Sequence, residues 1–313
     1  MICTCTMNPS LDYFMEFDQP VKAGAYNRSR KEYYEAGGKG INVSIVLSNL
    51  QIPTRALGFV GGFNKDFFIT LLEKYSFIQP SFTYTQGHTR VNVKLADGQK
   101  ETDLNGEGPL ISKDDMERLM AKTARLYKGD YFVLAGYSQS YLESDVRTML
   151  KRMMNDGVKV VLDTRPSITK SALRDHPFLI KTTQEELEEQ AGAPLTEDEI
   201  IYHMKELQNA GAVNVMVLTN EGKDALLVCS EGIYKGLLVR RRKPVSMVGT
   251  GDALVGGFLM NCLRSAGTVE SFRYGCCCAA ATAYVRGFAD RAMADELAEK
   301  FTVTCLEKGT SKA

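Results

Sequence analysis

The sequence predicts an α/β fold in which a mostly parallel sheet is covered by helices on both faces. From residue 113 onward, apolar strand-like runs alternate with helical patterns over about 200 residues, the order that builds a parallel sheet. The segments at residues 13–35 and 89–105 lie outside this rhythm, alternate like strands and hold few core residues, which predicts a small β lid. The 313 residues contain no internal repeat or low-complexity linker, so we expect a single domain over residues 1–313.

The N-terminal third begins with a strand and a glycine-rich loop. Residues 1–6 form the first predicted strand. The run GGKGINVSIVLSNLQI, residues 37–52, places apolar side chains near helical spacing after its glycines, which predicts a loop that enters a helix. The run TRALGFVGG, residues 54–62, reads as a strand closed by glycines. In the second lid segment, Asp97-Gly98 stands between two alternating runs and predicts a hairpin.

The elements after residue 113 are predicted from apolar runs and helical spacing. Strands are expected at residues 131–136, 158–163, 178–183 and 214–220, followed by an antiparallel pair at 225–230 and 232–239. Helices are expected at residues 113–127, 141–155 and 197–210, near Glu185, and twice after residue 250.

Bulk composition argues against two classes of partner. The chain has 38 basic and 38 acidic side chains, so a surface for nucleic acid is not expected. No apolar run approaches the roughly 18 residues that span a bilayer, and the N-terminus has no signal-type pattern. We therefore expect a cytoplasmic protein without a nucleic-acid or membrane partner. The eight cysteines lack zinc spacing and are interpreted as buried thiols in a reducing compartment.

The run VSMVGTGDALVGGF, residues 245–258, is the main candidate site. Its glycines let successive backbone N–H groups converge, and the apolar pattern after Asp252 places them at a helix N-terminus, where a phosphoryl group is stabilised. The residues alone leave two roles open for Asp252, a helix cap or a general base. Two standard nucleotide motifs fail, because Leu254 stands where a dinucleotide fingerprint needs glycine and Gly40 where a P-loop needs Ser or Thr.

Four stretches together resemble the ribokinase-like (PfkB) family of carbohydrate kinases. Residues 249–252 (GTGD) are similar to its Gly-Ala-Gly-Asp loop, and residues 36–44 (AGGKGINVS) to its N-terminal signature. Residues 6–12 (TMNPSLD) resemble the opening of the phosphosugar branch, and residues 89–109 the substrate-lid hairpin of 1-phosphofructokinases and tagatose-6-phosphate kinases. The resemblance covers nearly the whole chain. It implies a ribokinase-like three-layer α/β/α fold with a mostly parallel central sheet and a small β-sheet lid.

The resemblance implies ATP-dependent phosphorylation of a hydroxyl on a sugar phosphate, with ATP and Mg²⁺ as cofactors. Fructose 1-phosphate, converted to fructose 1,6-bisphosphate, is the expected substrate. The alternatives are a tagatose-6-phosphate or fructose-6-phosphate kinase, and a catalytically degenerate protein that only binds a sugar phosphate. In this family two lids often clasp each other, which implies a homodimer formed through the β lid.

The resemblance also implies roles for single residues. Asp252 would be the general base, and the amides of Gly249, Thr250 and Gly251 would stabilise the transferred phosphoryl group. The implied substrate-binding residues are Asp12 and Asn42 for the sugar hydroxyls, Gly37 and Gly38 for close backbone approach, and Lys39, Arg90 and Asn92 for the substrate's phosphate. The implied nucleotide-binding residues are Lys181, Glu186, Thr219, Glu221 and Gly222, with Glu186 also the expected ligand of the metal.

Several departures from the family pattern lie on the nucleotide side. Thr183 replaces an asparagine linked to magnesium and phosphate handling, and Glu221 replaces a glycine. Residues 136–140 (GYSQS) replace a Gly-Ser-Leu-Pro loop, while Met247 and Ala253 replace a common Thr and a common Ser. These changes leave the base and the anion-binding amides intact, so they bear on nucleotide affinity, metal dependence and turnover.

Overall fold

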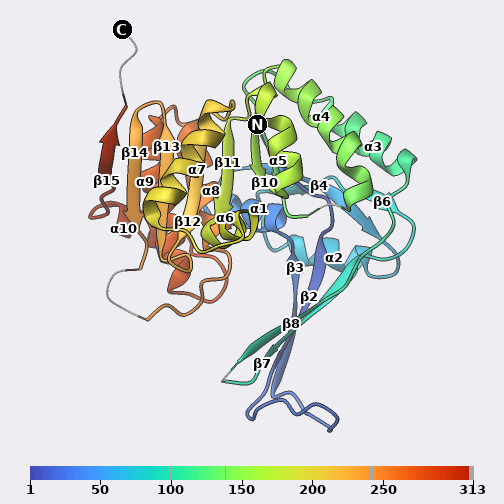
Figure 1. Cartoon of the computed structure of the whole chain (residues 1–313). Helices are drawn as coiled ribbons and strands as arrows, with labels where there is room; N and C mark the ends of the chain where they lie inside the picture. The colour runs from blue at the N-terminus through green and yellow to red at the C-terminus, as the bar shows by residue number, and fades with distance from the viewer. Residues whose placement is uncertain (99, 138, 240–242, 310–313) are drawn as a thin grey trace.

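The computed structural model describes residues 1–98, 100–137, 139–239 and 243–309. Its main body is an eleven-stranded sheet in the order β15-β14-β13-β12-β11-β10-β9-β1-β4-β5, with β6 paired to β4 (Figure 1). The pairings from β5 to β12 are parallel, and β13, β14 and β15 extend the sheet with antiparallel pairings. The strands are β1 (Ile2–Thr6), β4 (Thr54–Gly61), β5 (Ile78–Pro80), β6 (Thr83–Thr85), β9 (Tyr131–Ala135), β10 (Lys159–Asp163), β11 (Leu179–Thr183), β12 (Asn214–Thr219), β13 (Asp224–Cys229), β14 (Gly232–Leu237) and β15 (Thr304–Lys308).

Helices cover both faces of this sheet, which confirms the predicted three-layer arrangement. One face packs against α1, α8, α9 and α10, and the opposite face against α3, α4, α5, α6 and α7. The helices are α1 (Lys39–Asn49), α2 (Lys65–Leu72), α3 (Lys113–Thr123), α4 (Glu143–Asn155), α5 (Pro166–Ala172), α6 (Gln184–Ala191), α7 (Glu197–Asn209), α8 (Thr250–Leu263), α9 (Thr268–Ala283) and α10 (Arg291–Ala298). None of the described helices is long and apolar enough to cross a membrane.

A second, four-stranded sheet forms the lid, in the order β3-β2-β7-β8. Its strands are β2 (Ser10–Glu16), β3 (Lys31–Gly37), β7 (Arg90–Ala96) and β8 (Glu101–Asn105). The predicted hairpin joins β7 to β8 as an antiparallel pair, and β2 lies parallel to β7 in the centre. Figure 1 shows these strands extending away from the body as a narrow ribbon. The predicted small sheet is therefore confirmed.

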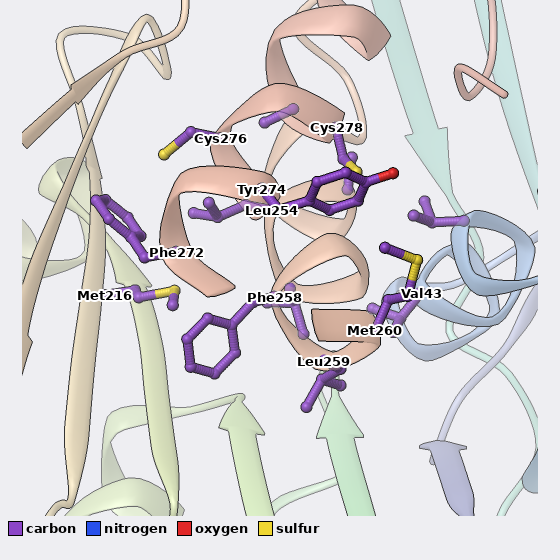
Figure 2. Packing of buried hydrophobic residues seen from close by; sticks show 14 of the residues in the cluster. Val43, Met216, Leu254, Phe258, Leu259, Met260, Phe272, Tyr274, Cys276 and Cys278 are labelled. Atoms are coloured by element: carbon purple, nitrogen blue, oxygen red, sulfur yellow. The ribbon is translucent and has the colours of Figure 1, made fainter. Parts of the chain in front are cut away.

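The pair α8–α9 is the centre of the largest apolar cluster. Phe258 of α8 and Phe272 of α9 are fully buried in it, and Cys276 and Cys278 pack there as well (Figure 2). The prediction of buried thiols is confirmed for six of the eight cysteines, but Cys262 is half-buried and Cys305 is exposed. Because α8 is buried along most of its length, its first turn is held rigidly where it meets the ends of the parallel strands.

Sequence patterns did not predict the short elements α2, α5, α10, β5, β6 and β15. The strands β5 and β6 have three residues each, and α5 has seven with a proline in its first turn. Such segments are too brief for a helical or alternating period to emerge. Their pairing and packing partners, rather than local patterns, decide where they form.

Candidate active site

The GTGD loop lies where the carboxyl ends of the parallel strands meet the first turns of α1 and α8. A cavity of about 420 Å³ opens there. Its walls are formed by the GTGD residues, two lysines, and side chains that follow β11 and β12. The lining residues are Lys39, Lys181, Thr183, Glu185, Leu218, Glu221, Gly222, Met247, Gly249, Thr250, Gly251 and Asp252. Ligands of open parallel sheets bind at this edge, because loops and helix N-termini gather there.

Asp252 is a buried carboxylate at the bottom of this cavity, with only 6% of its surface exposed. The N-cap of α8 is Gly249, and no side chain caps this helix. Asp252 Oδ2 instead accepts a hydrogen bond of 2.8 Å from Asn42 Nδ2 of α1. The helix-cap alternative for Asp252 is therefore wrong, and its carboxylate remains available for chemistry.

The environment of Asp252 raises the pKa of its carboxyl group above that of an exposed aspartate. Burial, reinforced by the negative charge of Asp163, raises the pKa of Asp252 to about 6, against the opposing effects of Lys181, Asn42 and Lys39. A carboxylate with this pKa is ionised at neutral pH and is a stronger base than an exposed aspartate.

Gly249 gives the loop its shape. Its φ of 81° lies in the left-handed region, and a Cβ built on it would lie 2.5 Å from the ring of Phe288. The chain then turns directly into α8, whose first amides have no partners within the helix. These amides and the helix dipole create a positive electrostatic field beside Asp252, a setting that favours an anion.

Two lysines and Asp163 form a charged cluster next to Asp252. Lys39 Nζ, in the first turn of α1, donates to Asp163 Oδ1 at 2.9 Å. Lys181 Nζ, on β11, donates to Asp163 Oδ2 at 3.1 Å. Asp163 itself is 2% exposed. Both ammonium groups thus lie at the cavity, where they can interact with phosphate oxygens.

Sequence reasoning missed Asp163. A usable signal was present, because Asp163 is the last residue of the predicted strand at residues 158–163. The carboxyl ends of parallel strands share one edge of the sheet, so a carboxylate at that position is a site candidate.

A second group of predicted residues lies at the base of the lid. Asp12 Oδ1 accepts hydrogen bonds from Ser10 Oγ at 2.7 Å and Asn92 Nδ2 at 2.9 Å. A Cβ on Gly37 would lie 2.4 Å from Asp12 Oδ2, so only glycine permits this approach of the backbone. Burial is the main cause that raises the pKa of Asp12. Arg90 Nε donates to the carbonyl of Asn8 at 3.1 Å, which anchors its stem beside Asp12.

The structure divides the predicted substrate residues between two groups. Asp12, Gly37, Arg90 and Asn92 belong to the lid base, whereas Lys39 belongs to the charged cluster around Asp163. The junction of β3 and α1, which contains Gly37, Gly38, Lys39 and Asn42, connects the two groups.

Thr183, one of the departures from the family pattern, has a structural role on the nucleotide side. It is the N-cap of α6 and forms a capping box with Glu186. Glu186 Oε2 also accepts from Thr182 Oγ1 at 2.6 Å, and Glu186 Oε1 lies 3.7 Å from Lys39 Nζ. The cap explains why threonine, a good N-cap residue, is accommodated here.

The turn after β12 accommodates Glu221, another departure from the family pattern. Glu221 has a φ of 55°, the left-handed conformation that a glycine adopts easily. Its side chain is 80% exposed and pairs with Lys223 at 2.5 Å, so the carboxylate lies at the rim of the cavity. Thr219 is buried, and its hydroxyl has no hydrogen-bond partner among the described residues. Gly222 lies against Met247, where a Cβ would be 3.4 Å from Cε.

The loop at residues 136–140 borders the charged cluster. The Tyr137 ring centre lies 5.9 Å from Lys39 Nζ, and Gln139 donates to the carbonyl of Pro109. Ser138 lies outside the described residues. Ala253, in the first turn of α8, is fully buried in the core.

The expected Mg²⁺ can be tested against the donors present. In the described part of the chain, no cluster of three or more acidic, histidine or cysteine side chains could hold a metal ion. Mg²⁺ at nucleotide sites is usually held by one or two carboxylates together with substrate phosphates. Glu186 does not itself line the cavity, but its Oε1 lies 3.7 Å from Nζ of the lining residue Lys39, while Oε2 takes the hydrogen bonds from Thr182 and Thr183. Glu186 Oε1 is therefore the oxygen that could serve as the single carboxylate ligand of that mode.

Comparison with known proteins adds independent findings. The model of the pfkB family of carbohydrate kinases matches residues 6–293. The chain is 35% identical over 308 residues to 1-phosphofructokinase of Bacillus subtilis, covering 98% of this chain and 100% of that protein. It is 29% identical over 309 residues to D-tagatose-1-phosphate kinase of Bacillus licheniformis, with coverages of 98% and 100%. A Staphylococcus aureus crystal structure, provisionally described as a phosphofructokinase, superposes with a TM-score of 0.84 at 32% identity, over 98% of this chain and 100% of that one.

Proposed function

Because the chain belongs to the pfkB family of carbohydrate kinases, we propose that it transfers the γ-phosphoryl group of ATP to a hydroxyl of a sugar phosphate. The observation that carries this proposal is the position of a buried carboxylate, Asp252, beside the amides of the first turn of α8, which no side chain caps. The first group can take a proton, and the second can stabilise the charge of the transferred group.

The substrate we propose is fructose 1-phosphate, with fructose 1,6-bisphosphate as the product. Support comes from the 1-phosphofructokinase relatives, which align over nearly their whole length. A relative named for D-tagatose 1-phosphate makes that ketose phosphate a close second substrate. Tagatose 6-phosphate and fructose 6-phosphate are the alternatives to be tested beside them.

In the proposed reaction, residues of the chain position the sugar phosphate, deprotonate its attacking hydroxyl and stabilise the charge of the transferred phosphoryl group. The lid base, with Asp12, Asn92 and Arg90, orients the sugar phosphate, and Asp252 accepts the proton of the attacking hydroxyl. The amides of residues 249–252 and the ammonium groups of Lys39 and Lys181 stabilise the negative charge on the phosphoryl group.

The nucleotide would lie along the opposite wall, against Thr219, Glu221 and Gly222. Glu186 would hold Mg²⁺, which supplies charge neutralisation between the phosphates when bound. The lid limits the access of water, which otherwise consumes ATP by hydrolysis.

We also propose that two copies of the chain form a homodimer through their lids. On one face of its sheet, register pairs Tyr13 with Tyr34 and Val93, and Met15 with Leu95. None of these side chains is fully buried in the single chain, and they form an apolar stripe that has Glu32 beside it, opposite Met15. The opposite face carries Asp12, Asn92 and other site residues. A second lid that covers the stripe would bury it and protect the sheet.

The proposed function is tested with a panel of phosphosugars and coupled detection of ADP. We expect fructose 1-phosphate to give the highest kcat/KM. Turnover of only a free sugar or a nucleoside would contradict the phosphosugar assignment. If no substrate releases ADP while phosphosugar binding is intact, the alternative of a catalytically degenerate binding protein is supported instead.

The variant Asp252→Asn tests the role of the base. It keeps the shape of the side chain but cannot accept the proton, so we expect kcat to fall by about 10³-fold or more. Phosphosugar affinity, measured by calorimetry, should remain close to that of the wild type. Substantial residual kcat in the folded variant would remove Asp252 from the role of base.

A further inference from the structure

Asp163 is a buried carboxylate to which the proposed reaction assigns no role. We propose that Asp163 is a positioning residue that holds the ammonium groups of Lys39 and Lys181 away from Asp252, so that the base stays free to accept a proton. The inference rests on the proposed function of this site. It concerns a residue that acts through the two lysines bonded to it.

The geometry of the pairings carries the inference. Asp163 lies at the end of β10, and each of its two oxygens binds one lysine, Oδ1 with Lys39 at 2.9 Å and Oδ2 with Lys181 at 3.1 Å. The Asp163 and Lys181 side chains are only 3% and 4% exposed. Water therefore cannot replace either partner at little cost.

Both lysines lie close enough to Asp252 to compete for it. They line the same cavity, and a Cβ on Gly251, next to Asp252, would lie 3.0 Å from Lys181 Nζ. Within the described part of the chain, both lysines nevertheless form ion pairs with Asp163 rather than with Asp252. Lys39 also pairs with Glu186. Asp252 receives its hydrogen bond from the neutral amide of Asn42.

This distribution of charge matters for a general base. An ammonium group bonded directly to Asp252 would stabilise its ionised form and make it a weaker base. The charged groups that act on Asp252 are Asp163 on β10, Lys181 on β11 and Lys39 on α1. Asp163 bonds both cations and offsets part of their charge, so Asp252 retains its proton affinity while the ammonium groups can still meet phosphate oxygens.

The variant Asp163→Asn removes the counter-charge and keeps the size of the side chain. Lys181 then loses its ion-pair partner and turns to Asp252, whereas Lys39 is shared between Asp252 and Glu186. We expect the acidic limb of the kcat/KM profile for fructose 1-phosphate, at saturating ATP, to shift to lower pH by about one unit or more. The plateau kcat should fall by about tenfold or more, because the base is weaker and tied to a cation.

A double-mutant cycle separates this role from a merely structural one. Lys181→Met should move the acidic limb to higher pH by a larger amount in the Asp163→Asn background than in the wild-type background. Asp163→Glu, which keeps the counter-charge, should leave the limb near its wild-type pH. Equal shifts by Lys181→Met in both backgrounds would overturn the inference.

A direct titration makes the test independent of turnover. Carbon-13 NMR of labelled aspartate carboxyls, with Asp252→Asn to assign the resonance, should show a lower Asp252 pKa in folded Asp163→Asn protein. If that variant does not fold, Asp163→Ser removes the same charge and is titrated in its place. An unchanged Asp252 pKa in a folded variant overturns the inference, whereas absence of phosphoryl transfer by the wild type would overturn only the proposed function.

Discussion

At the scale of single residues, the environment of Asp252 predicts the response of activity to pH. Burial and the charge of Asp163 raise its pKa to about 6, and the ionised form is the one that accepts a proton. We therefore expect kcat/KM to be constant above pH 7 and to fall about tenfold for each unit below pH 6. Initial rates with fructose 1-phosphate in buffers from pH 4.5 to 8.5, chosen to bracket that value, measure this limb.

The control for this profile is reversibility. Enzyme held at the lowest pH and returned to neutral pH should recover its full rate, which shows that titration rather than unfolding causes the loss. A kcat/KM that stays constant from pH 8.5 down to about pH 5, as for a base with the pKa of an exposed aspartate, would show that burial of Asp252 does not control its ionisation in the working enzyme.

At the scale of elements, the capping box of α6 explains an unusual residue on the nucleotide side. Thr183 Oγ1 accepts from the Glu186 amide at 3.3 Å, and the Thr183 amide donates to Glu186 Oε2 at the same distance. Thr183→Ala should lower the free energy of unfolding by about 1 kcal/mol, and Thr183→Asn should change it little, because asparagine caps equally well. Urea unfolding followed by circular dichroism measures both.

The same pair of variants separates stability from nucleotide handling. Thr183→Asn restores the residue common in relatives, so any change in the KM for ATP at unchanged stability reports the side chain's effect on the nucleotide. Equal stability of the alanine and asparagine variants would contradict a capping role for Thr183.

At the scale of the whole molecule, the lid sheet carries the predicted site residues on one face and the apolar stripe on the other. Because successive residues of a strand alternate between faces, Leu95 belongs to the apolar stripe and its neighbour Lys94 to the face that carries Asp12 and Asn92, where it pairs with Asp103. In the proposed dimer, Leu95→Glu would place a charge in a buried interface and should produce a monomer. Sedimentation velocity measures the oligomeric state.

The matched control is Lys94→Gln, which changes a charge on the same strand but on the opposite face. It should leave the dimer intact. A wild-type protein that sediments as a monomer at micromolar concentration, or a Leu95→Glu variant that remains a dimer, would contradict assembly through the lid.

Much of this architecture could be predicted because its signals are local. The alternating runs, the Asp-Gly hairpin and the helix after the GTGD loop each appear within a short window, and the structure contains all of them. The short elements α5, β5 and β6 were missed, because so few residues show no period and their position depends on the sheet they join.

The sequence by itself determined which residues form the candidate base and the glycine loop beside it, since Gly249 to Asp252 are consecutive and their conformational requirements are local. Only the tertiary structure decided what surrounds Asp252. Asn42 is 210 residues away from it, and Lys39 is 124 residues away from Asp163. Such contacts form because parallel strands and their crossovers bring distant carboxyl ends to one edge of the sheet, and no short window of sequence records that order.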